Sequence, residues 1–313
     1  MTNLFVIGNG FDLDHNLKTS YNDFRKYLLS EYAEIKMDEM IIPSGSYLQD
    51  GGVEYDDVEV LSMLFYLINQ AENNYEKWSN IEKSLGYLDF SEAFEFYDDI
   101  LDDDGDTDWW KTAYRNEEIA SQLVIPTFKI QEFFWEWIHT INLDSVTPKR
   151  DFNNLINEKD KFLTFNYTET LEVVYGISSK NICHIHGKQH EEIFFGHGNN
   201  KDYYEEYMSS HIGSENSISK IYDFLRKDTT KALEKNIDFF DGLVNEDICN
   251  IFSYGFSFNE VDSIYIEELC KRIKTENITW YFNDYDISNI GHYIQYVKKC
   301  GFSGNFNIFH IGG

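Results

Sequence analysis

Short apolar runs alternate with amphipathic stretches along much of the chain, and this alternation predicts an α/β fold. Apolar spacing typical of helices fills most of the intervals between the runs, for example over residues 218–240 and 263–273. Strands alternating with helices favour a parallel, doubly wound sheet, in which ligands bind beyond the carboxyl ends of the strands. The predicted strands are residues 3–8, 162–165, 182–185, 248–254, 278–282 and 306–311.

The pattern changes between residues 33 and 153, where strand signals fade and the chain becomes acidic, aromatic and helical. Val60–Ile68 is an apolar run, and the apolar residues within Phe128–Ile141 recur near the helical period. We therefore expect an α/β core of residues 1–32 and 154–313. Residues 33–153 are expected to form a mostly helical insertion.

Two segments of this insertion, residues 37–55 and 101–109, are predicted to be loops. The second contains five aspartates, which suggests a calcium-binding loop. The spacing of an EF-hand does not fit, because placing Gly105 at the sixth loop position puts Ile100 first and Lys111 twelfth. A solvated acidic loop is the better interpretation.

Composition and charge narrow the class of protein. The chain has 313 residues, of which 42% are hydrophobic and 17% aromatic, so it can bury a sizeable core. The formal net charge of −29 argues against direct binding of nucleic acid or of an anionic membrane surface. It still allows an anionic small ligand in a local pocket of backbone N–H groups. Without CxxC pairs, signal-peptide features or an apolar run of spanning length, we expect a cytoplasmic protein.

The first predicted strand ends in Gly8-Asn9-Gly10, followed by Phe11 and Asp12. In nucleotide-binding α/β domains such a turn lets the backbone approach a phosphate, which then meets N–H groups at a helix start. A plain tight turn explains the same residues equally well. Asp12 is a candidate ribose ligand or helix cap. No third glycine follows at dehydrogenase spacing, so hydride transfer is not expected.

Polar residues also follow the other predicted strands: Asn166 after the second, His186 after the third, and Gly255 and Ser257 after the fourth. Because the carboxyl ends of parallel strands meet at one edge, we expect these residues to share a crevice. An amide such as Asn166 can orient a water or a ribose hydroxyl, and His186 can act as a general base. The alternatives are a turn asparagine and a core histidine.

The remaining histidines and one carboxylate leave further possibilities open. His184 shares a strand face with His186, so one ring can support the other. His184, His186, His190 and His197 suggest a metal site, but no acidic residue stands at a recognised ligand spacing, and no metal is expected. Asp262 is a second candidate ribose ligand or helix cap.

Taken in order, these motifs resemble the AbiH family of bacteriophage abortive-infection proteins. The order and spacing match over nearly the whole chain. The resemblance implies a role in anti-phage defence, with a phage or host protein as the trigger. The motifs are Gly8–Asp12, Thr19–Phe24, Phe165–Thr168, His184–Gly187, Phe195–Gly198 and Gly255–Ser257, with Asp262.

The same order of motifs is similar, more distantly, to the sirtuin-type NAD-binding core, and this implies a Rossmann-like fold. By this resemblance Asn166 holds the catalytic water and the ribose, and His186 is the catalytic histidine. The chain lacks a four-cysteine zinc module, which argues against protein deacylation, and Thr168 stands where an aspartate is usual. The residues implied to contact the dinucleotide are Gly8, Asn9, Gly10, Phe11, Asp12, Phe24, Arg25, Gly255 and Ser257.

We therefore expect an anti-phage NAD glycohydrolase that cleaves NAD to nicotinamide and ADP-ribose, with NAD as its substrate and no metal. The nicotinamide of NAD is already cationic, so the site needs an oriented water and a base but no strong acid. The alternative is a nucleotide-sensing or protein-interaction module without turnover, whose working surface is the acidic insertion. A nuclease fits less well because of the charge. A homo-oligomer is compatible with both hypotheses.

Overall fold

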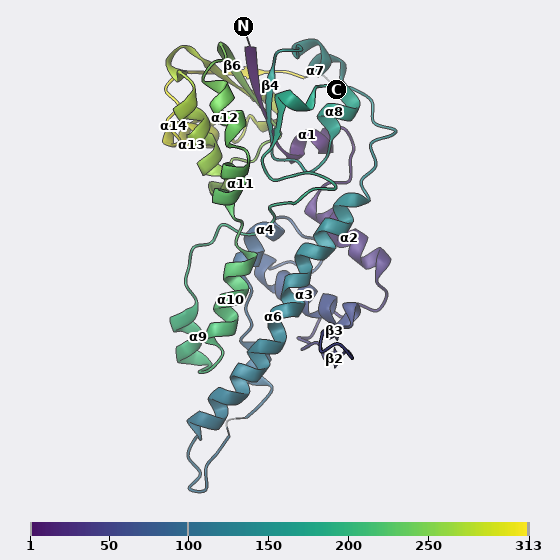
Figure 1. The fold of residues 1–313 in the computed structure, drawn as a ribbon, viewed down its shortest axis with the longest axis vertical. Coiled ribbons are helices and arrows are strands. Elements are labelled where there is room, and N and C mark those ends of the chain that lie inside the picture. Colours follow the sequence, from purple (N-terminus) through teal and green to yellow (C-terminus); the bar gives the residue numbers. More distant parts are fainter. Residues whose placement is uncertain (1, 99, 312–313) are drawn as a thin grey trace. The chain divides into compact units, whose positions relative to one another are not determined.

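The computed structural model describes residues 2–98 and 100–311, which divide into two compact units (Figure 1). The first unit takes in the chain up to Ser20, Ile138–Phe194 and the chain from Asp228 onward. The second unit consists of Tyr21–Trp137 and Phe195–Lys227. Each unit is therefore assembled from segments that are distant in the sequence.

A six-stranded parallel sheet forms the centre of the first unit. Its order is β5-β4-β1-β6-β7-β8, so the chain moves outward from β1 through β4 and β5, and then from β6 through β7 and β8. The order reverses between β1 and β6. The predicted α/β class, with a parallel sheet flanked by helices, is confirmed. The strands are β1 (Thr2–Ile7), β4 (Lys161–Thr164), β5 (Ile182–His184), β6 (Ile248–Tyr254), β7 (Thr279–Asn283) and β8 (Asn305–Phe309).

Helices cover both faces of this sheet, because successive strand side chains point to opposite faces and both sets are apolar. On one face Leu4 and Val6 pack with residues of α11 (Thr229–Lys235), α12 (Ile237–Leu243), α13 (Ser263–Arg272) and α14 (Ile290–Lys299). On the other face Phe5 and Ile7 pack with residues of α1 (Asn9–Asp14), α7 (Arg150–Leu155) and α8 (Thr170–Tyr175). Short 3-10 helices connect these elements, namely η2 (Ser179–Asn181), η3 (Glu260–Asp262), η4 (Thr275–Asn277) and η5 (Asp284–Asp286).

The second unit is mostly helical, with one short hairpin of β2 (Gly45–Tyr47) and β3 (Val53–Tyr55). The long helix α6 (Trp109–His139) belongs to it except for its last two residues. In the described part of the chain, no helix has both the length and the apolar character needed to cross a membrane. The other helices are α2 (Tyr21–Glu31), α3 (Asp57–Glu72), α4 (Ile81–Ser84), η1 (Leu85–Tyr87), α5 (Glu92–Glu95), α9 (Tyr204–Ser210) and α10 (Glu215–Leu225).

The division between the units differs from the predicted boundaries at residues 32 and 154. Helix α2 and residues 195–227 belong to the second unit, although the sequence pattern placed them in the α/β core. The reason is visible at Phe24 of α2, which is fully buried and packs its ring against Trp78, Phe134 and Trp137 at centroid distances of 5.8, 5.3 and 5.2 Å. A pattern read within one helix does not reveal such long-range contacts.

The helical pattern predicted over residues 218–240 corresponds to helices that are separated by short breaks. Three helices occupy this stretch: α10 ends at Leu225, α11 begins at Thr229 and α12 follows α11 after one residue. Lys227 leaves the helical pattern because its N–H donates to the His197 carbonyl oxygen at 2.9 Å. Asp228 then caps α11, accepting a hydrogen bond from the N–H of Lys231 at 2.9 Å.

Candidate active site

The carboxyl edge of the sheet gathers the polar residues that follow β1, β4, β5 and β6. The register of the parallel pair β4–β5 places Thr164 beside His184. Asn166 and His186 each lie two residues beyond the carboxyl ends of these adjacent strands. Both residues therefore follow strands that end at the same edge of the sheet, and their sharing of one crevice stays a prediction.

Three glycines bring the loops after β1 and β6 into backbone contact. A Cβ on Gly8 would lie 2.5 Å from the carbonyl oxygen of Gly255, and a Cβ on Gly10 would lie 2.6 Å from its Cα. Gly255 has a φ of +66°, and a Cβ there would lie 2.3 Å from the nitrogen of Phe11. The N–H groups of Gly8, Gly10 and Phe11 already donate to backbone carbonyl oxygens at 2.9–3.0 Å. Loop packing therefore requires these glycines, and their predicted contact with a phosphate stays a prediction.

Other residues predicted to contact a dinucleotide have varied environments. The Phe11 side chain is fully buried in the hydrophobic core of the first unit. Asn9 is exposed, and its amide donates to the carbonyl oxygen of Thr19 at 2.9 Å. Ser257 is also exposed, and its hydroxyl oxygen accepts a hydrogen bond from Asn259 Nδ2 at 2.9 Å. Of these three side chains, Asn9 and Ser257 are accessible at the carboxyl edge.

Phe24 and Arg25 lie on α2 and take part in the packing of the second unit. Phe24 is one of its core rings, as described above. Arg25 is buried, its Nη2 donates to the carbonyl oxygen of Tyr75 at 2.6 Å, and its guanidinium lies 5.5 Å from the centre of the Phe65 ring. Burial lowers the pKa of Arg25. These contacts explain both residues structurally, and their predicted role toward a dinucleotide stays a prediction.

Asp12 is a buried carboxyl group held by two threonines. Only 1% of the residue is exposed. The Thr168 hydroxyl donates to Oδ2 at 2.5 Å and the Thr170 hydroxyl donates to Oδ1 at 2.9 Å. Burial raises the pKa of Asp12, while the two hydroxyls and the nearby amide of Asn166 act in the opposite direction. Thr168 therefore supports a carboxyl group contributed by α1.

Asn166 is the most unusual polar side chain at this edge. It is 5% exposed, and its amide lies close enough to the Asp12 carboxyl group to act on the pKa of that group, but no well-aligned hydrogen bond satisfies its side-chain oxygen or nitrogen. Its backbone is fixed, because its N–H donates to Thr164 Oγ1 at 3.2 Å and its carbonyl oxygen bonds with His184 Nδ1 at 3.1 Å. A buried amide left in this state costs about 1–3 kcal/mol. The amide is therefore available to a ligand group or an ordered water.

His186 forms a buried pair with Asp262. The ring is 4% exposed, and its Nε2 lies 3.1 Å from Oδ1 of Asp262, which is 5% exposed at the end of η3. The ring packs edge-on against Phe165 at 5.3 Å and also contacts Tyr265 at 5.6 Å. Nε2 and Oδ1 are close enough for an ion pair but are not aligned for a hydrogen bond, and with Nε2 facing the carboxylate, Nδ1 is the other ring nitrogen that can contact a ligand. The sequence pattern singled out both residues but did not pair them.

The other histidines have separate partners. His184 Nε2 lies 3.0 Å from the Glu172 carboxylate, and although burial acts the other way, the contacts with His184 lower the pKa of Glu172. His197 lies in the second unit, where its Nε2 bonds with the Tyr222 carbonyl oxygen at 3.0 Å and burial lowers its pKa to about 4. Within residues 2–98 and 100–311, no three His, Cys, Asp or Glu side chains are placed to hold a metal ion.

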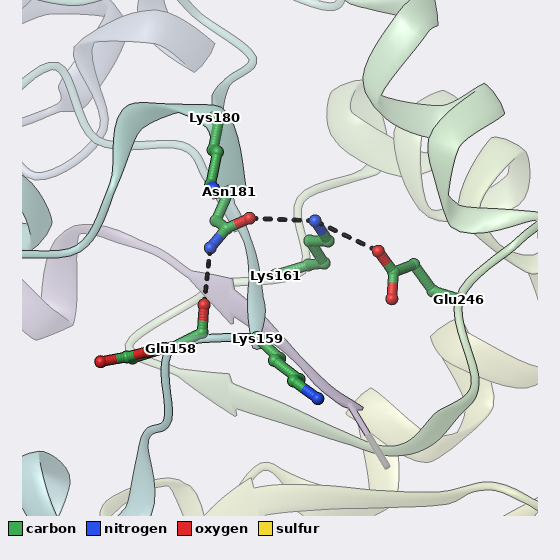
Figure 2. Close-up of a pocket in the computed structure, with 6 residues that line it drawn as sticks. All are labelled: Glu158, Lys159, Lys161, Lys180, Asn181 and Glu246. Atoms are coloured by element: carbon green, nitrogen blue, oxygen red, sulfur yellow. Dashed lines mark hydrogen bonds and ion pairs between the residues drawn. The ribbon is translucent and has the colours of Figure 1, made fainter.

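An open pocket of about 400 Å³ lies at the opposite edge of the sheet, where β4 and β5 begin (Figure 2). One of its lysines is fully engaged: the Lys161 ammonium donates to Asn181 Oδ1 at 2.9 Å and pairs with Glu246 at 3.2 Å (Figure 2). None of the predicted site residues is among those that line it, and ligands of open α/β sheets bind at the carboxyl edge. The lining residues are Glu158, Lys159, Lys161, Lys180, Asn181 and Glu246.

Comparison with known proteins identifies the family. The chain matches neither a curated protein nor a solved structure. A family model described as "Bacteriophage abortive infection AbiH" matches residues 4–284. The matched segment includes Asp12, Asn166, His186 and Asp262. Because the match covers most of the 313 residues, the chain belongs to the AbiH family of bacteriophage abortive-infection proteins.

Proposed function

We propose that this AbiH protein hydrolyses NAD to nicotinamide and ADP-ribose and that this reaction is its contribution to defence against phage. One observation carries the proposal: the Asn166 amide is buried without a well-aligned hydrogen bond just beyond β4, and the buried His186, which pairs with Asp262, follows the adjacent strand β5. A group that orients a water and a base that removes its proton are the two components that this hydrolysis requires.

The strand order supports a dinucleotide as the ligand. Counting only the strands of this sheet, the order β5-β4-β1-β6-β7-β8 corresponds to 3-2-1-4-5-6, the order of the Rossmann fold. Dinucleotides bind there in the crevice where the order reverses. In this chain the reversal lies between β1 and β6, next to the loops that contain Gly8 and Gly255. A sirtuin-like arrangement of the NAD site is part of the proposal.

The chemistry balances with the groups available. The bond between C1′ of the ribose and the nicotinamide nitrogen breaks, and nicotinamide leaves with the electron pair as a neutral molecule. The oxygen of a water bonds to C1′, and the water releases one proton. Asn166 orients the water and a ribose hydroxyl, and His186 accepts the proton at Nδ1. The Asp262 carboxylate stabilises the resulting imidazolium.

The closed state of the site suits an abortive-infection enzyme. Asn166, His186 and Asp262 are only 4–5% exposed, so NAD reaches them only after the covering segments move. Continuous loss of NAD would damage an uninfected cell, and a resting state without access prevents it. The same burial is compatible with the second candidate, a sensor that binds a nucleotide without turnover.

The test is release of nicotinamide from NAD by the purified protein, with an extract of phage-infected cells added as the trigger. Asn166→Ala and His186→Ala are expected to lower the rate about 10²–10⁴-fold. Asn245→Ala and His292→Ala serve as matched controls, because both residues are exposed in the same unit, and they are expected to retain activity.

Equally slow release by the wild type and both site variants, with the extract present, would refute the hydrolase proposal. Calorimetry with NAD and ADP-ribose then tests the sensor. Tight binding that depends on Asn166, without release of nicotinamide, would favour the sensor over the enzyme.

A further inference from the structure

Exposed aromatic and acidic side chains lie close together at the amino-terminal end of α6 and in the loop before it. Trp109, Trp110 and Tyr114 are 63%, 89% and 71% exposed. Residues 101–106 of the loop are all exposed and include four aspartates. We name Asp103, Asp104, Asp106, Trp109, Trp110 and Tyr114 the tip surface. Clustered rings exposed to this degree are typical of surfaces that bind a partner.

Backbone hydrogen bonds hold the loop next to the helix. The Asp102 N–H donates to the Asp106 carbonyl oxygen at 2.8 Å, and the Asp108 N–H donates to the Ile100 carbonyl oxygen at 2.7 Å. The Asp102 carboxylate accepts the N–H groups of Asp104 and Asp106, both at 3.0 Å, so its role is internal to the loop. These hydrogen bonds give the loop a defined conformation. They leave the carboxylates of Asp103, Asp104 and Asp106 on its surface.

The helix extends this surface with the same mixture of side chains. Trp110, Tyr114 and Glu118 follow one another at four-residue spacing, so they share one face of α6 and lie about one turn apart. Glu117 and Glu118 are both exposed. A partner that lies along this face therefore meets two aromatic rings followed by a carboxylate.

This combination fits the guanidinium group of arginine. A guanidinium stacks on aromatic rings and forms paired hydrogen bonds with carboxylates, which an ammonium does less well. Beside the tip surface the chain itself places a guanidinium against an aromatic ring: that of Arg115 lies 5.7 Å from the centre of the Tyr97 ring, and its Nη1 donates to the backbone carbonyl oxygen of Asp98 at 2.6 Å. We propose that the tip surface binds an arginine-rich segment of a partner protein.

Charge distinguishes this partner from other occupants. A second copy of the chain, with a net charge of −29, would bring like charges together at this surface. Nucleic acid and anionic membranes would be repelled in the same way. The positive charges of an arginine-rich segment are instead attracted to this surface at long range. On contact, its guanidinium groups stack on the exposed rings. Every residue of the tip surface belongs to the second unit, so the proposal is independent of NAD hydrolysis.

Fluorescence anisotropy with a labelled peptide of alternating arginine and glycine tests the proposal at physiological salt. The triple variant Trp109→Ala, Trp110→Ala, Tyr114→Ala is expected to weaken binding at least about tenfold. The triple variant Asp103→Asn, Asp104→Asn, Asp106→Asn is expected to weaken it similarly and to reduce its salt dependence. These side chains are exposed, so the variants should fold, and circular dichroism checks this.

The β2–β3 hairpin supplies matched controls in the same unit. Tyr47 is 87% exposed there, and Asp50 and Glu54 are exposed too. Tyr47→Ala, and Asp50→Asn with Glu54→Gln, are expected to leave the affinity within about twofold of wild type, because they change a similar ring and similar charges elsewhere.

Three results of the binding measurements would overturn the proposal. The first is the absence of binding. The second is equal weakening by the tip and hairpin variants, which would make binding a property of net charge alone. The third is equal affinity for a lysine–glycine peptide, since only a guanidinium both stacks and bonds in pairs. Hydrogen exchange at saturating arginine peptide is expected to protect residues 100–114, and protection spread evenly over the chain would also contradict the proposal.

Discussion

Replacing Gly255 by alanine tests whether packing between loops, rather than a ligand, requires the glycines at the carboxyl edge. The backbone at Gly255 has a φ of +66°, which costs an alanine about 1–2 kcal/mol. Its Cβ would also lie 2.3 Å from the nitrogen of Phe11 and 2.5 Å from the Cα of Gly10. These are backbone atoms that cannot rotate away, so overpacking adds about 1–3 kcal/mol. The expected loss is about 2–5 kcal/mol, or at least about 30-fold in the folding equilibrium.

Amide hydrogen exchange across β1 and β6, followed as a function of urea, measures this loss without nucleotide. Gly291→Ala on α14 is the matched control, because nothing lies within 4 Å of its added Cβ, and alanine there is expected to be neutral or to stabilise by up to about 1 kcal/mol. If Gly255→Ala left the opening free energy of both strands unchanged but abolished NAD binding, the glycine would serve the ligand. The packing explanation of the loop would then be refuted.

Three further predictions concern charged and polar groups. Asp262→Asn is expected to lower kcat for NAD hydrolysis with little effect on nucleotide affinity, because an amide cannot stabilise the His186 imidazolium; unchanged kcat in steady-state kinetics would contradict this. Burial lowers the pKa of His197 to about 4, so this side chain binds a proton more readily in the unfolded state. The unfolding free energy of the second unit should therefore fall by about 3 kcal/mol between pH 6.5 and pH 4. Urea titration monitored by tryptophan fluorescence checks this, and His197→Gln should flatten the dependence; an identical dependence in the variant would refute the assignment. Thr168→Val removes a donor from the buried Asp12 carboxyl and should destabilise the first unit by about 1–3 kcal/mol, whereas unaltered urea unfolding would argue against it.

The sheet could be predicted from the sequence because its strands are buried on both faces. In β1, residues from Leu4 to Ile7 are fully buried, and both the odd and even positions have to be apolar. Short helices were harder to predict, because six residues contain too few turns to display a period. Helix α1, which starts at Asn9 directly after the glycine, was missed for that reason.

The candidate site was only half predictable. Asn166 and His186 stand immediately after apolar runs, so their place at the edge follows from local pattern. The partnership of His186 with Asp262 does not, because it depends on how β5 and the segment after β6 are brought together by the fold. Locally, Asp262 resembles a helix cap, since α13 begins at the next residue. The packing of Phe24 likewise depends on contacts with distant segments.

The central claim is that this edge of the sheet consumes NAD during infection, and the NAD content of phage-infected cells tests it most directly. Cells producing the wild-type protein or the exposed control His292→Ala are expected to lose NAD after infection, whereas cells producing His186→Ala are expected to keep it. Protection of wild-type cells from phage with NAD unchanged would contradict the claim.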